Sequence, residues 1–148
     1  MANPPAVPRA ARSVFDEHRT LRSLLAQVES AFARSAPHAG SGPDVVAARL
    51  DTLRGPLGAH FDEEERARLF EEIEERAPEQ AAACARLRGE HGALLCRLDL
   101  LRSASPVDRR REAWGREVRA FLADLRGHEA RETDLLTRTL DRSEGVGD

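Results

Sequence analysis

Four long segments with apolar residues at every third or fourth position constrain the fold of this chain most strongly. Each segment would form an amphipathic helix, with one face that another helix must cover. Glycine, proline and serine separate the segments, and no strand pattern or tandem repeat intervenes. The predicted helices span residues 13–34, 43–76, 78–103 and 105–142. We therefore predict an all-α protein, an antiparallel up-down-up-down four-helix bundle.

Local signals mark the ends of these predicted helices. Ser13 can cap the first helix, and Ser105 followed by Pro106 is a strong start for the last one. Gly55 and Pro56 lie within the second helix, where we expect a kink rather than a break because the apolar pattern resumes in phase. The expected organisation is a flexible tail, one bundle domain and a second flexible tail, at residues 1–12, 13–142 and 143–148.

Charge and hydropathy exclude several classes of partner. The net charge is −3 and the two signs are interspersed, which argues against a nucleic-acid surface. The densest basic run, residues 108–112, is interpreted as a solvated helix surface. The chain contains neither an apolar run of the ~20 residues that a membrane span needs nor the apolar segment of a secretion signal. These features predict a cytoplasmic protein with no membrane partner; the oligomeric state cannot be inferred.

Two cysteines lie in the third predicted helix. Cys84 and Cys96 are twelve residues apart, which is about 18 Å along a helix and too far for a disulfide. We interpret both as reduced thiols.

Histidines lie on the apolar face of every predicted helix. His18, His60, His91 and His128 each have leucine or phenylalanine neighbours at helical spacing. The fifth histidine, His38, lies in the loop rich in glycine, proline and serine and is expected to be an ordinary surface residue. One histidine on an apolar face is usually a hydrogen-bonded core residue, but four on four helices indicate a shared site.

Two of these histidines have a glutamate four residues later. Glu64 follows His60 and Glu132 follows His128, and this spacing places both side chains of a pair on one helix face. Either pair alone could share a solvated edge. Four imidazoles and two carboxylates buried in one interior need charged or hydrogen-bonding partners, and no Lys or Arg on these helix faces provides them. We therefore predict a metal site.

The donor set restricts the metal. Imidazole and carboxylate ligands suit iron, manganese, zinc or copper, whereas calcium and magnesium prefer oxygen alone. Six donors are too many for one tetrahedral zinc and suit two ions bridged by the carboxylates. The Glu-x-x-His pairing of ferritin-type di-iron bundles is absent, because Leu57, Arg88 and Leu125 precede His60, His91 and His128 by three residues.

The stretches "DEHRTL", "HFDEEE", "GEHGALL" and "HEARE" resemble the hemerythrin-like, HHE cation-binding family over residues 13–140. The resemblance implies a non-haem di-iron centre (Fe²⁺/Fe³⁺) completed by a bridging oxygen from solvent, with zinc or manganese as alternatives. It implies that His18 and His60 bind one iron and that His91 and His128 bind the other. It assigns the bridging positions to Glu64 and Glu132.

The chain departs from the oxygen-carrying hemerythrins, which it otherwise resembles, at two positions. Those proteins carry HxxxH on the third helix and Asp on the fourth, whereas this chain has Leu95 and Glu132. One imidazole fewer leaves an extra coordination position, which favours binding or reduction of O₂ or peroxide over reversible oxygen carriage. Iron or oxygen sensing, or iron buffering without enzymatic activity, is the alternative, and a structural zinc site is a third possibility. Glu63, Glu90 and Glu129 flank the ligands and are expected to support them or to face solvent.

Overall fold

The computed structural model describes residues 9–33 and 42–144, and all regular structure in these residues is helical. The prediction of an all-α protein is confirmed. The described residues form six α-helices rather than four, because two of the predicted helices are divided. The elements in chain order are α1 (Arg9–Ala33), α2 (Gly42–Arg66), α3 (Leu69–Arg76), the 3₁₀ helix η1 (Pro78–Gln80), α4 (Ala81–Arg102), α5 (Pro106–Arg109) and α6 (Glu112–Glu144).

The second predicted helix is divided at Ala67 and Arg68, and it is not broken at Pro56, in agreement with the prediction. The helix α2 continues through Pro56, whose missing N–H removes one hydrogen bond without ending the helix. Arg68 has φ 55° and ψ 39°, a left-handed conformation that a helix cannot contain. Its N–H bonds to the carbonyl of Glu65 at 3.2 Å, which closes the last turn before α3 begins. The sequence offers no glycine here to signal this break.

Of the two predicted helix caps, Ser105 is observed and Ser13 is not. The Ser105 side chain accepts a hydrogen bond from the Asp108 N–H at 3.1 Å, as expected of a helix cap, although α5 ends after one turn. The prediction for Ser13 is wrong, because α1 begins at Arg9 and therefore contains Ser13. The tail residues 1–8 and 145–148, and the loop with His38, lie outside the described residues.

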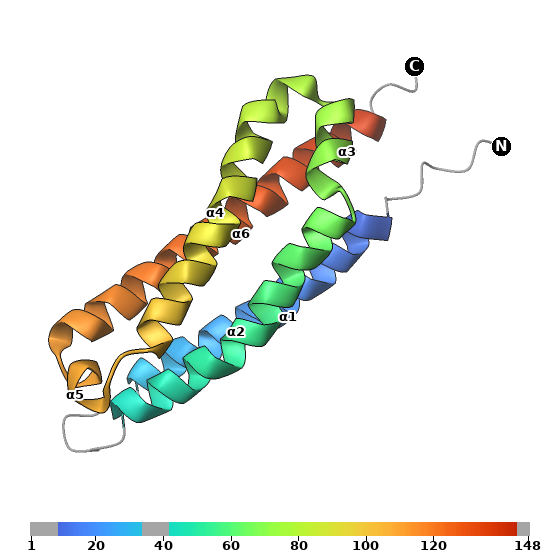
Figure 1. Ribbon diagram of the computed structural model, residues 1–148. Coiled ribbons are helices and arrows are strands. Elements are labelled where there is room, and N and C mark those ends of the chain that lie inside the picture. The colour runs from blue at the N-terminus through green and yellow to red at the C-terminus, as the bar shows by residue number, and fades with distance from the viewer. Residues whose placement is uncertain (1–8, 34–41, 145–148) are drawn as a thin grey trace.

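The four long helices α1, α2, α4 and α6 lie side by side along the long direction of the molecule (Figure 1). Contacts join α1 to α2, α2 to α4, α4 to α6, and α6 back to α1. These contacts close a ring, so the four apolar faces share one interior. The short helix α3 packs against α4 and α6. No helix among the described residues is long and apolar enough to cross a membrane.

Two hydrophobic clusters fill this interior, and the predicted site lies between them. One cluster includes Leu21, Leu57, Leu94 and Leu125. The other includes Val14, Leu69, Leu87 and Leu135. On each long helix, or on α2 with its continuation α3, the site residues fall between a member of the first cluster and a member of the second. The six predicted donors thus form a polar layer across the core.

Both cysteines lie in α4 and are free thiols, as predicted. Cys84 is buried and Cys96 is exposed. Burial raises the pKa of the Cys84 thiol to about 11, so this group is protonated at neutral pH and is a poor nucleophile.

Candidate metal centre

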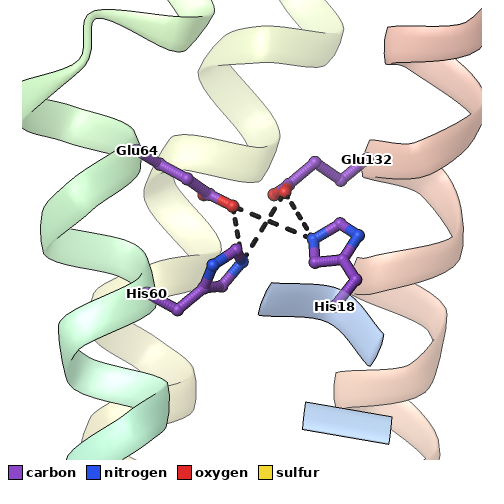
Figure 2. A group of neighbouring side chains, drawn as sticks. All are labelled: His18, His60, Glu64 and Glu132. Atoms are coloured by element: carbon purple, nitrogen blue, oxygen red, sulfur yellow. Dashed lines mark hydrogen bonds and ion pairs between the residues drawn. The ribbon is translucent and has the colours of Figure 1, made fainter. Parts of the chain in front are cut away.

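The structure brings all six predicted donors together in the interior. None is more than 3 % exposed. The carboxylates of Glu64 and Glu132 point toward one another and toward the imidazoles of His18 and His60 (Figure 2). Two sets of side chains offer possible metal-donor atoms, and within each set these atoms all lie within 4.8 Å of one another. The first set is His18, His60, Glu64 and Glu132, and the second is His91, His128 and Glu132.

Glu64 divides its two oxygens between the two pairs of histidines. Its Oε1 lies 2.6 Å from His60 Nε2 and 3.9 Å from His18 Nε2. Its Oε2 faces the other way and lies 3.1 Å from His91 Nε2. One carboxylate therefore contacts both halves of the layer.

Glu132 is arranged in the same way from the opposite helix. Its Oε1 lies 2.9 Å from His18 Nε2 and 3.8 Å from His60 Nε2. Its Oε2 lies 3.3 Å from His128 Nε2. The two glutamates thus lie between a His18–His60 pair and a His91–His128 pair.

Many of these close contacts lack the alignment of a hydrogen bond. A buried polar atom without a partner costs about 1–3 kcal/mol, and more if the group is charged. Cations held by lone pairs on these nitrogens and oxygens would satisfy all of them except His91 Nδ1, which lies 3.6 Å from Glu65 outside the layer, so the residues present fit a metal. Within residues 9–33 and 42–144, the buried donor atoms of this layer with no hydrogen-bond partner are His60 Nε2, both Glu64 oxygens, both His91 nitrogens, His128 Nε2 and Glu132 Oε2.

Three of the four histidines have a hydrogen-bond partner on the ring nitrogen that faces away from the layer. His18 Nδ1 lies 3.1 Å from Thr133 Oγ1, and His60 Nδ1 lies 2.5 Å from Glu17 Oε2. His128 Nδ1 lies 2.8 Å from a Glu90 oxygen. A donor N–H on Nδ1 leaves the Nε2 lone pair directed into the site, as metal-binding histidines require.

The arrangement around His128 extends to the surface. Glu90 also accepts two hydrogen bonds from the Arg131 guanidinium, at 2.5 and 3.0 Å. Burial alone would raise the pKa of Glu90, but Arg131 and His128 outweigh it and lower that pKa. The expectation that Glu90 supports a ligand is therefore consistent with its contacts, whereas Glu63 is paired with Arg66 at the surface.

Replacing Thr133 with valine is expected to weaken metal binding by about 10- to 100-fold with the fold intact, because His18 loses the hydrogen bond that orients its ring. Isothermal titration of the metal-free variant with Fe²⁺ measures this loss. Thr137→Val is the matched control, since within the described part of the chain that hydroxyl donates to the Thr133 carbonyl one turn away and to no residue of the layer. Equal weakening in both variants would contradict the role given to Thr133.

Two phenylalanine rings contact imidazoles of the layer, Phe61 from the first hydrophobic cluster and Phe70 from the second. The Phe61 ring stacks on the His91 ring at 4.0 Å between centroids and 8° between planes, and Phe70 lies 5.7 Å from His91. Phe61 also lies 5.8 Å from His60 and 5.4 Å from His128. These rings limit the space open to water beside the imidazoles. Phe61 could not be singled out from the sequence, because its stacking on His91 depends on how α2 packs against α4.

The metal-free site holds protons tightly. Burial alone would lower the pKa of His60, but contacts with Glu64, Glu17 and Glu132 outweigh it and raise that pKa to about 9. The two carboxylates differ: burial raises the pKa of Glu64, whereas contacts with His128 and His18 outweigh burial and keep the pKa of Glu132 well below its usual value. In the metal-free protein, imidazolium groups therefore neutralise part of the buried negative charge.

The stability of the metal-free protein is expected to fall as the pH rises from about 6.5 to 9. The folded-state pKa of His60 exceeds its unfolded value of 6.5, so its stabilisation is complete below 6.5 and is lost as the pH passes about 9. The loss is on the order of 3 kcal/mol. Urea unfolding across this range measures it, and a slope unchanged in His60→Gln would contradict the assignment.

Helical structure throughout the described residues, with a buried layer of histidines and glutamates that fits a cation, defines a helical metal-binding protein. Residues 10–140 match the family described as Hemerythrin HHE cation binding domain. The match covers most of the chain, and the protein therefore belongs to the hemerythrin HHE cation-binding family. Comparisons with curated proteins and with solved structures gave no match.

Proposed function

We propose that this protein is a non-haem di-iron protein that binds or reduces O₂ or peroxide. The observation that carries the proposal is the orientation of Glu64 and Glu132, each with one oxygen toward the His18–His60 pair and the other toward the His91–His128 pair. A single ion would not need two carboxylates that face in two directions. The ring of contacts among α1, α2, α4 and α6 supports the up-down-up-down bundle as the scaffold.

Each half of the layer would hold one ion. His18 and His60 would bind the first and His91 and His128 the second, with the two glutamates between them. Two Fe²⁺ ions would supply the two electrons that, with two protons, convert one H₂O₂ to two H₂O. Leu95, four residues after His91, provides no donor and packs against the core, so it leaves coordination space on the second ion.

A surface pocket of about 310 Å³ reaches His60, one of the first pair of histidines. His60 and Glu17 form part of its wall, together with Pro56, Ala59 and Arg66. Since His60 is only 3 % exposed, the pocket brings a small ligand next to the layer without opening it to bulk water. A larger pocket, of about 470 Å³, surrounds Trp114 and includes none of the six donors.

The test is to purify the protein from iron-replete cells and to measure iron per chain and absorption with and without azide. About two irons per chain and charge-transfer bands that shift with azide support the proposal. Consumption of H₂O₂ with ascorbate as electron donor, much faster than with free iron, identifies turnover. Two irons without turnover would favour a sensing or iron-buffering module. Stoichiometric zinc without colour would overturn the redox function.

A further inference from the structure

A third glutamate is buried beside the six donors. Glu129 is 5 % exposed and follows His128 directly in α6. Its Oε1 is buried and has no hydrogen-bond partner among the described residues. A carboxylate removed from water needs a compensating charge or donor, and this one has neither within hydrogen-bond distance on that oxygen.

Glu129 lies on the side of α6 that faces α1, because Arg126, three residues before it, donates to Glu29 of α1, and Thr133, four residues after it, contacts His18. Burial raises the pKa of Glu129, and the nearby Arg22 guanidinium does not pair with its Oε1. Arg22 is exposed and its Nε donates to the His18 carbonyl instead. Glu129 and Glu132 are three residues apart, so their side chains lie on the same face of α6.

We propose that Glu129 is an additional metal ligand, a terminal carboxylate for the ion held by His18 and His60. This inference rests on the proposed two-ion centre and makes its two positions unequal. The first position has a carboxylate of its own besides the shared Glu64 and Glu132. The second, between His91 and His128, has no such carboxylate among the described residues, because Glu65 and Glu90 contact the Nδ1 atoms of these histidines, and Leu95 adds no donor. The first ion should therefore bind more tightly than the second.

Anaerobic titration of the metal-free protein with Fe²⁺ tests this assignment in Glu129→Gln. We expect the wild type to bind two ions, and the variant to bind one of them at least about tenfold more weakly. The metal-free variant should not be less stable than the metal-free wild type, because the substitution removes a buried carboxylate whose Oε1 has no hydrogen-bond partner among the described residues. Glu117→Gln, at an exposed position of the same helix, is the control.

Mössbauer spectra of the ⁵⁷Fe²⁺-loaded proteins identify which ion changes. One of two quadrupole doublets should shift in Glu129→Gln and the other should remain. Unchanged affinity for both ions would overturn the assignment, as would weaker binding accompanied by lower stability of the metal-free variant, which indicates a packing role. A wild type that itself does not bind two ions would contradict the proposed two-ion centre, and this result is distinct from a change confined to Glu129→Gln.

Discussion

Replacing Glu132 with alanine is expected to reduce bound metal from about two ions per chain to almost none. Glu132 belongs to both sets of converging donors, with Oε1 toward His18 and Oε2 toward His128. Removing it takes one ligand from each ion at once and leaves imidazoles that repel each other when protonated. Because loss of an outer-shell partner already costs 10- to 100-fold in affinity, loss of a shared ligand should cost more than about 100-fold per ion.

Metal analysis of the purified variant after desalting measures this result. Glu132→Gln keeps the volume of the side chain and should show the same direction of change, which separates ligand loss from a cavity in the core. Glu117→Gln, exposed on the same helix, should retain two ions. Two bound ions in Glu132→Ala would contradict the shared role of this residue.

Removing the metal from the wild type should lower its melting temperature by roughly 10 °C or more. Metal at 1,000 times its dissociation constant stabilises the folded state by about 4 kcal/mol per site. At this chain length each kcal/mol corresponds to about 2–4 °C. The physical cause is the layer of buried atoms without hydrogen-bond partners, which a cation satisfies and an empty site does not.

Thermal unfolding followed by circular dichroism, with and without a chelator, measures this change. Added Fe²⁺ should restore the melting temperature of the chelated wild type and should leave that of Glu132→Ala unchanged. A melting temperature that is the same with and without metal would show that no ion is bound in the core.

The convergence of these six side chains could be predicted from sequence because their signal is local. A histidine at an apolar position, or a glutamate four residues after it, is visible within one helix and needs no knowledge of the partner helices. Because each of the four predicted helices has one apolar face to bury, these faces are expected to meet in a common interior. The structure confirms that meeting for His18, His60, Glu64, His91, His128 and Glu132.

The residues that hold the histidines in place could not be predicted in this way. Thr133 is 115 residues from His18, and Glu17 is 43 residues from His60, so each contact depends on the register between two helices. The break at Arg68 likewise depends on packing, since α3 turns toward α4 and α6 and nothing in the local sequence marks the position. Periodicity predicts which face is buried but not what lies opposite it.

The most direct test of the two-ion centre is a crystal structure of the iron-loaded protein with anomalous scattering recorded at the iron edge. We predict two anomalous peaks per chain between α1, α2, α4 and α6, one bound by His18 and His60 and one by His91 and His128, with Glu64 and Glu132 contacting both. A single peak, or none within this layer of side chains, would contradict the account.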